Sequence, residues 1–266
     1  MKLLPMINMK GGISMTGVSG IHDSGYYMRQ IASGKKINSA SDDAAGLAIV
    51  NKVNSNSNAQ KVNAENDRSG INAMNIADGA LSGITDYLDR IKELSVKASN
   101  GTLSYSDKRA IQNEIDENIK GIDQITGTAQ FNTKKLLTGA DMSIATNPDG
   151  TGINVGVGVA TSEALGLKGY SVMGNFDMSV IDDALERVSS MRSSAGASTN
   201  ALEYAYNYSM LSAENLDSAS SRIEDVDVAK AVSEQKKNSL LEQYRVMTQK
   251  KQMENENVIN KMLTGV

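Results

Sequence analysis

Apolar side chains recur at alternating spacings of three and four residues over two long stretches of the chain. The first stretch runs from Gln60 to Ser99 and contains no proline. Its seam positions are Met74, Ala77, Leu81, Ile84, Leu88, Ile91, Ser95 and Ala98, of which seven of eight are apolar. This spacing is the seam of a coiled coil, so it predicts a long helix that packs along another helix.

A second helix is predicted soon after the first. Asn100-Gly101-Thr102 is a helix-ending signal, and Ser106-Asp107 offers an N-cap for the next helix. One face of that helix would carry Ile111, Ile115, Ile119 and Ile122. Because the link is short, we expect the two helices to lie antiparallel.

Residues 140–170 have a different pattern. Apolar and polar residues alternate from Met142 to Thr146, turn residues follow at 147–150, and the alternation resumes from Gly152 to Val159. This arrangement predicts a β-hairpin. Because glycine weakens isolated strands, we expect the hairpin to pack on the helices.

The spacing of three and four returns at Ile181 and continues without proline to Val226. Eleven of the fourteen seam positions are apolar and the other three are serine. The fourteen positions are Ile181, Ala184, Val188, Met191, Ala195, Ser198, Leu202, Ala205, Ser209, Ser212, Leu216, Ala219, Ile223 and Val226. Such a helix would be roughly 70 Å long. The predicted fold is therefore mostly α, an elongated antiparallel helical bundle or coiled coil with a small β-hairpin element.

Both ends of the chain are poor in apolar residues at helical spacing. The first 33 residues contain five glycines, and each glycine inside a helix costs about 1 kcal/mol relative to alanine. We predict disordered termini that become helical on assembly, when a ring of subunits buries their apolar side chains. These side chains are Leu3, Leu4, Met6, Ile7, Ile13 and Val18 at one end, and Leu240, Leu241, Met247, Val258, Ile259 and Met262 at the other.

Composition excludes several kinds of function. There is no cysteine for a disulfide or a thiol nucleophile, and His22 is the only histidine, which argues against a transition-metal site. The net charge is -4 and the densest lysine patches are only pairs, such as Lys35-Lys36, so nucleic acid is not an expected partner. The sequence contains no run of about 18 apolar residues, so we do not expect it to insert into a membrane. We expect a protein without cofactors that is not an enzyme.

Two further clusters have structural interpretations. Asp42-Asp43 precedes an alanine-rich helical run, so the pair is interpreted as helix capping and not as catalytic carboxylates. Tyr204, Tyr206 and Tyr208 are expected on different faces of a helix, which argues against a stacking platform for bases.

Several separate motifs follow one another along the chain, namely IASGKKINSASDDAAGLAI (31–49), ADGAL (77–81), LDRIKELSVKASNGT (88–102), IQNEI (111–115), QFN (130–132) and ASSRIEDVDVAKA (219–231). Their sequences and order resemble those of bacterial flagellins. The resemblance covers about residues 28–170 and 178–232. Because the helical pattern returns shortly after Leu165-Gly166-Leu167, the chain resembles a short form that lacks the variable outer domain.

The resemblance implies a structural subunit that polymerises into the flagellar filament for swimming motility. It would be secreted to the extracellular flagellum without a cleaved signal peptide, and none is visible at the N-terminus. The implied organisation is an N-terminal inner-tube segment at 1–44, helices of an outer bundle at 45–139, the hairpin and a connector at 140–177, the long helix at 178–228, and a C-terminal inner-tube segment at 229–266.

The resemblance also implies partners. These are other copies of the chain, an export chaperone that binds the C-terminal segment, and the filament cap and junction proteins. A Toll-like flagellin receptor of animal hosts would bind a patch formed by Arg90, Leu94 and Glu114. Lys97 belongs to the same patch and stands where the family has glutamine. Alternatively, these residues face neighbouring subunits in the filament wall.

Two other functions stay open at this point. One is a hook–filament junction protein, although the run from Asp42 to Ile49 favours a flagellin. The other is a secreted, flagellin-like binding or adhesion protein that does not polymerise.

Overall fold

The computed structural model describes residues 19–264, so the N-terminal apolar residues up to Val18 lie outside the described part of the chain. The elements are α1 (Ser19–Ser33), α2 (Ala44–Ala98), α3 (Tyr105–Thr128), β1 (Gln130–Phe131), β2 (Lys134–Lys135), β3 (Met142–Ala145), β4 (Gly152–Val155), α4 (Ser179–Glu224) and α5 (Val228–Thr264). The chain divides into two compact units, which are residues 54–217 and the remainder. The predicted mostly helical fold is confirmed.

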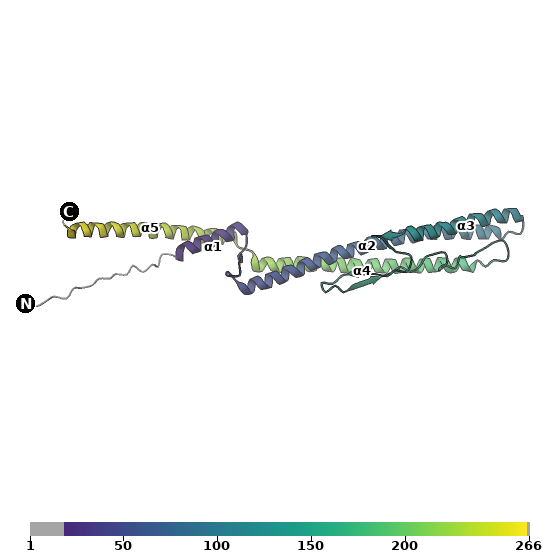
Figure 1. Cartoon of the computed structure of the whole chain (residues 1–266), viewed down its shortest axis with the longest axis horizontal. Helices are drawn as coiled ribbons and strands as arrows, with labels where there is room; N and C mark the ends of the chain where they lie inside the picture. Colours follow the sequence, from purple (N-terminus) through teal and green to yellow (C-terminus); the bar gives the residue numbers. More distant parts are fainter. Residues whose placement is uncertain (1–18, 265–266) are drawn as a thin grey trace, which may run out of the picture. The chain divides into compact units, whose positions relative to one another are not determined.

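Within the unit formed by residues 54–217, helices α2 and α4 run antiparallel along each other (Figure 1). Lys61 near one end of this part of α2 pairs with Asp217 of α4 at 2.8 Å. Lys92 near the other end of α2 pairs with Asp182 of α4 at 2.6 Å. As residue numbers rise along α2, those of its partners therefore fall along α4.

Helix α3 folds back on α2, as the short link predicts. A Cβ added at Gly121 of α3 would lie 2.6 Å from the ring of Tyr87 on α2, so the glycine permits a close approach. Arg90 of α2 also pairs with Glu114 of α3. The lower-numbered residue of α2 meets the higher-numbered residue of α3, which confirms the antiparallel arrangement.

The predicted N-cap of α3 is wrong by two residues. Ser104, and not Ser106, is the N-cap, with φ -72° and ψ 163°. The Ser104 hydroxyl accepts from the Asp107 N–H at 3.2 Å, and the Asp107 carboxylate accepts from the Ser104 N–H at 3.1 Å. This reciprocal capping box satisfies two free donors, which Ser106 inside the first turn cannot do.

The seam residues form the core of this unit. All eight predicted seam positions of α2 are buried, and none of the fourteen predicted for the second seam is exposed. Ser95 is polar but well bonded, because its hydroxyl donates to the Ile91 carbonyl at 2.8 Å and accepts from the Tyr170 hydroxyl at 3.0 Å. The sequence pattern therefore identified the part of the core that α2 and α4 contribute, while Leu137, Leu165 and Leu167 add to it from outside the predicted seams.

The predicted hairpin is present but shorter than expected. Met142 of β3 pairs with Val155 of β4, and Ala145 pairs with Gly152, in antiparallel register. The strand β4 ends at Val155 and does not continue to Val159, because β3 begins at Met142 and offers no partner beyond it. Val159 instead forms an isolated bridge with Thr138.

A second small sheet was not predicted. The two-residue strands β1 and β2 pair around Asn132 and Thr133, whose φ angles are 45° and 66°. Positive φ at both central residues is the geometry of a tight hairpin turn. Threonine seldom adopts this conformation, so the sequence carries only a weak signal for the turn.

In the other unit, helices α1 and α5 lie against each other (Figure 1). The terminal segments are helical over residues 19–33 and 228–264 in the single chain. That they become ordered only on assembly stays a prediction. Among the helices of residues 19–264, none has the length and apolar character needed to cross a membrane.

Candidate functional site

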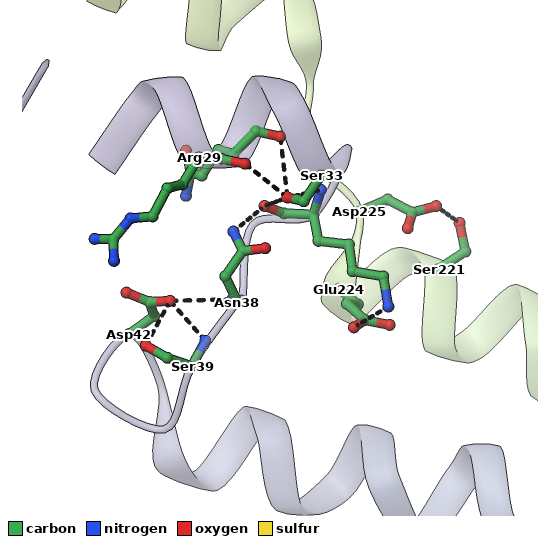
Figure 2. A network of polar contacts seen from close by, with 10 residues as sticks. Arg29, Ser33, Asn38, Ser39, Asp42, Ser221, Glu224 and Asp225 are labelled. Atoms are coloured by element: carbon green, nitrogen blue, oxygen red, sulfur yellow. Dashed lines mark hydrogen bonds and ion pairs between the residues drawn. The ribbon is translucent and has the colours of Figure 1, made fainter. Parts of the chain in front are cut away.

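The two segments that carry flagellin-like motifs meet at a short crossing of the chain, formed by residues 34–36 and 224–226. The N–H of Val226 donates to the Gly34 carbonyl at 3.0 Å, and the N–H of Lys36 donates to the Glu224 carbonyl. The Lys35 ammonium lies 2.7 Å from the Glu224 carboxylate (Figure 2). This chain crossing links the end of α1 to the connection between α4 and α5.

Gly34 has the backbone conformation that the crossing requires. Its φ is +71°, in the left-handed region, and it directly follows the last residue of α1. Glycine adopts this conformation without the steric cost that a Cβ brings, and it is common just after a helix. The Ser-Gly pair of the motif is therefore explained by helix termination.

The loop between α1 and α2 is organised by Asp42 (Figure 2). One of its carboxylate oxygens accepts from the Asn38 N–H at 3.0 Å, the Ser39 N–H at 2.8 Å and the Ser39 hydroxyl at 3.1 Å. The hydrogen bond from the Asn38 N–H is the main cause of a pKa lowered below the usual value for Asp42. The side-chain amide of Asn38 in turn donates to the Lys35 carbonyl at 2.9 Å, and this bond connects the loop to the chain crossing.

The helices that leave the chain crossing are both capped by aspartate. Asp43 accepts from the Gly46 N–H at 2.8 Å at the start of α2, and Asp227 accepts from the Lys230 N–H at 3.1 Å at the start of α5. A Cβ on Gly46 would lie 2.4 Å from the Asp43 carboxylate, so a larger residue would displace the capping side chain. The interpretation of Asp42-Asp43 as a capping pair is confirmed for Asp43, while Asp42 closes the preceding loop.

The part of the α2–α4 seam before Met74 is polar, a feature that the sequence analysis missed. Ser57, Gln60, Asn63 and Asp67 are all buried there. Asp67 is 0% exposed, and neither of its carboxylate oxygens has a hydrogen-bond partner. Burial raises the pKa of Asp67 to about 6. Their spacing alone could have placed these polar residues in the seam, because they continue the three–four spacing of its apolar positions.

The apolar residues predicted for the C-terminal assembly segment all lie on α5 and are exposed. They are Leu240, Leu241, Met247, Val258, Ile259 and Met262. Leu240, Met247, Val258 and Met262 fall on one side of the helix, because their spacings are close to whole turns. The exposed Tyr244 lies on the same side. We call these five residues the α5 stripe.

The residues predicted for the receptor patch are only partly on the surface. The Arg90 guanidinium pairs with the carboxylates of Glu93, at 3.1 Å, and of Glu114. Arg90, Lys97 and Glu114 are exposed, whereas the side chain of Leu94 is 3% exposed and belongs to the core. The surface available to a partner is therefore formed by the charged members.

Known proteins resemble the chain over most of its length. Residues 21–141 match the bacterial flagellin N-terminal helical region, and residues 178–261 match the bacterial flagellin C-terminal helical region. The chain is 35% identical over 240 residues to the flagellar filament 33 kDa core protein of Treponema phagedenis. It is 33% identical over 240 residues to the flagellin FlaB1 of Treponema pallidum, and 35% over 257 residues to the flagellin of Bacillus subtilis. Each alignment covers 81% of this chain and 84% of the relative.

Proposed function

The chain belongs to the bacterial flagellin family, and on that premise we propose that its terminal segments, residues 1–44 and 229–266, form the inner tube of the filament. The protein is a structural subunit of the extracellular flagellar filament, polymerises with other copies of itself, and is not an enzyme. The outer bundle is assigned to residues 45–228, with the hairpin element at 140–177.

The exposed α5 stripe is the observation that carries this proposal. Large apolar side chains exposed along one side of a helix mark a surface that another protein covers. The described part of the chain does not cover the stripe, since Met247 and Met262 are 69% and 80% exposed. Packing of α5 helices from neighbouring subunits would remove these side chains from water together. Because each side chain is already partly covered, its burial would contribute less than the roughly 1.5–3 kcal/mol expected for a fully exposed one.

The two alternative functions are less well supported. The relatives are named as flagellins and filament core proteins, which favours a filament subunit over a junction protein. The same names argue against a binding protein that never polymerises, since the relatives are filament proteins.

Substitution in the α5 stripe tests the proposal. Leu240→Ser with Met247→Ser should raise the concentration needed for polymerisation by at least about tenfold, the factor that corresponds to roughly 1.4 kcal/mol. Gln249→Ser is the matched control, since this exposed residue lies on the opposite side of α5. Sedimentation of filaments at graded protein concentrations measures both. Equal critical concentrations for the stripe variant and the control would contradict the inner-tube assignment.

We also propose that an export chaperone binds the α5 stripe before assembly, with residues 230–263 as its target. The same exposed apolar residues need to be covered while the subunit is a monomer, and helix-in-groove binding is one way to cover them. Isothermal titration with the chaperone should show binding by the full chain and none by a chain that ends at Asp227. If the shortened chain binds the chaperone with unchanged affinity, the chaperone site lies outside residues 230–263. The filament cap and junction proteins are proposed to contact the inner-tube segments in the same way as a neighbouring subunit.

The surface around Arg90 and Glu114 is a second candidate binding site, for a Toll-like flagellin receptor. The exposed ion pair of these two residues presents a guanidinium at the surface in a fixed position. Arg90→Ala should weaken receptor binding in surface plasmon resonance, whereas Lys120→Ala on the exposed surface of α3 should not. Equal affinities of the two variants would favour a role for Arg90 in the filament wall.

A further inference from the structure

Asparagine is followed by glycine at one place in the sequence, Asn100-Gly101. Both residues are exposed and lie in the link between the end of α2 at Ala98 and the start of α3 at Tyr105. Asparagine is among the chemically labile residues, because the main-chain nitrogen of the next residue can attack its side-chain amide. A following glycine favours this attack, since it has no Cβ to hinder the approach.

The main-chain nitrogen of Gly101 is available for this attack. Its N–H has no acceptor among the residues that the structure describes, whereas the N–H of Asn100 beside it donates to the Lys97 carbonyl at 3.2 Å. A Cβ added at Gly101 would meet no atom within 4 Å, so the main chain has space to rotate there. Inside a helix the corresponding nitrogen is held by a hydrogen bond to the preceding turn. Gly101 lies just past the end of α2 and is not held in this way.

The side-chain carbonyl of Asn100 is polarised by Thr102. Its Oδ1 accepts from the Thr102 N–H at 3.1 Å and from the Thr102 hydroxyl at 2.9 Å. Negative charge develops on this oxygen when a nucleophile adds to the carbonyl carbon. Two donors directed at the oxygen stabilise that charge, as the oxyanion hole of an enzyme does. The link therefore combines an activated amide with a nitrogen that has no acceptor.

The Asn-Ser pairs of the chain lack this combination. In Asn38-Ser39 the N–H of Ser39 donates to the Asp42 carboxylate at 2.8 Å. The other Asn-Ser pairs lie inside α2 and α5, where helical hydrogen bonds hold the nitrogen. They are Asn54-Ser55, Asn56-Ser57 and Asn238-Ser239.

Asp149-Gly150 repeats the arrangement with a carboxylate in place of the amide. The Asp149 Oδ1 accepts from the Thr151 N–H at 2.9 Å and from the Thr151 hydroxyl at 2.6 Å. The hydrogen bond from the hydroxyl is the main cause of a lowered pKa for Asp149, so this group stays ionised and is a poor electrophile. The N–H of Gly150 also donates to the Asn147 carbonyl at 3.0 Å. Of these pairs, Asn100-Gly101 alone has both a neutral amide and an unbonded nitrogen.

We propose that Asn100 is a site of spontaneous deamidation, through a cyclic imide formed with the Gly101 nitrogen. The Gly101 nitrogen loses its proton to hydroxide and bonds to the Asn100 Cγ. The Cγ–Nδ2 bond breaks, and Nδ2 leaves as ammonia after it takes a proton from water. Water then opens the imide at either carbonyl and leaves an aspartate or an isoaspartate at position 100. The net change is the loss of ammonia and the gain of water, without an oxidant or a cofactor.

The reaction changes the exposed link in two ways. A carboxylate at position 100 adds a negative charge beside the C-terminal end of α2, where the helix dipole favours the positive charge of Lys97. Isoaspartate also lengthens the main chain by a methylene group. The Asn100 carbonyl accepts from the Leu103 N–H at 3.3 Å, and Leu103 packs against the core, so the longer main chain would disturb this contact. Because water does not reverse the reaction, the modified fraction would rise with the age of the subunit.

Mass spectrometry of the full chain tests the proposal. Trypsin cuts after lysine and arginine and releases residues 98–108, in which Asn100 is the only amide side chain. After the folded monomer is incubated in warm, mildly alkaline buffer, this peptide should gain the mass difference between hydroxyl and amino groups. It should also separate into an aspartate form and an isoaspartate form. Residues 53–61 are the internal control, and their Asn-Ser pairs inside α2 should convert at least about tenfold more slowly.

Two glycine variants separate the local chemistry from general effects of substitution. Gly101→Ala should slow conversion at least about tenfold, because the added Cβ hinders the attack. Gly127→Ala on α3 is the matched control, since a Cβ there also meets no atom within 4 Å, and it should leave the rate unchanged. Equal rates in the two variants would overturn the inference.

Conversion in urea measures what the fold contributes. The folded chain should convert at least as fast as the unfolded chain, because unfolding breaks the hydrogen bonds from Thr102 to Asn100. If residues 98–108 keep their mass in the folded chain, or convert only in urea, the fold protects Asn100 and the inference is overturned. These measurements use the monomer, so their failure is distinguishable from a failure of the proposed function.

Discussion

The main-chain N–H of Val226 donates a hydrogen bond to the carbonyl oxygen of Gly34 at 3.0 Å. This bond joins the start of the chain to its far end, and the Lys35–Glu224 ion pair lies beside it. The chain crossing therefore lies where α1 ends, just before Gly34, and where α5 begins, just after Val226. Weakening it should affect the terminal helices before it affects the core of residues 54–217.

Gly34→Ala is expected to open the chain crossing more often. The φ of +71° at Gly34 is unfavourable for alanine by about 1–2 kcal/mol, which corresponds to roughly a five- to thirtyfold change in an equilibrium constant. Hydrogen exchange at the Val226 amide should therefore accelerate by a factor in that range.

Gly25→Ala is the matched control for Gly34→Ala. Gly25 lies within α1, has no atom close to an added Cβ, and is exposed. Alanine favours the helix there by about 1 kcal/mol, so exchange should slow or stay unchanged. Equal acceleration in both variants would show that the left-handed conformation of Gly34 is not what matters.

Leu202→Ala is expected to destabilise the outer bundle. Leu202 is 0% exposed in the α4 seam, so truncation should cost about 2–5 kcal/mol. Leu211→Ala on the same helix is the control, and it should change stability by no more than about 0.5 kcal/mol because Leu211 is exposed. Urea denaturation of the monomer gives both values. Equal midpoints would mean that Leu202 is not in a core.

Asp67 should make the bundle less stable at neutral pH than at acid pH. Its pKa is raised from 3.8 to about 6 by burial, so between these values the folded state holds a proton that the unfolded state has lost. The free energy of unfolding therefore falls as pH rises from about 4 to 6, and the cost at pH 7 is about 3 kcal/mol. Asp67→Asn cannot ionise and should lack this part of the pH dependence in urea denaturation measured from pH 4 to 7.

Asp217→Asn provides a control of opposite sign. The hydrogen bond from Lys61 lowers the pKa of Asp217, so its carboxylate stabilises the fold above the unfolded pKa and this contribution is lost as pH falls. Replacing the Asp217 carboxylate should reduce the loss of unfolding free energy at acid pH. The fall in unfolding free energy between about pH 4 and 6 that Asp67 causes should remain. If wild type and Asp67→Asn have parallel profiles, Asp67 is not the buried group that titrates.

The ends of the monomer are expected to be more sensitive to protease than its middle. The exposed α5 has no buried residue after Ala231 within its described side chains, so local unfolding there has little to oppose it. Limited proteolysis should leave a core of about residues 45–228. Uniform resistance along α5 would show that this helix is stable without neighbours.

The sequence predicted the features that depend on local periodicity. The seams through Leu81 and Leu202 were identified because buried residues repeat with the helix turn. The cap at Ser104 was misplaced because two serines lie near the helix start and only the backbone geometry distinguishes them. The pairing of Gly34 with Val226 joins distant segments, so no local pattern reveals it. Asp67 was missed because it keeps the three–four spacing of the seam but is not apolar, and the seam was identified by both criteria together.

The central claim is that this flagellin polymerises through its terminal segments, and electron microscopy of the purified chain tests it most directly. The full chain at rising concentration should form helical filaments, whereas a chain that ends at Asp227 should stay monomeric under the same conditions. Persistent monomer from the full chain, or identical filaments from the shortened chain, would contradict the account.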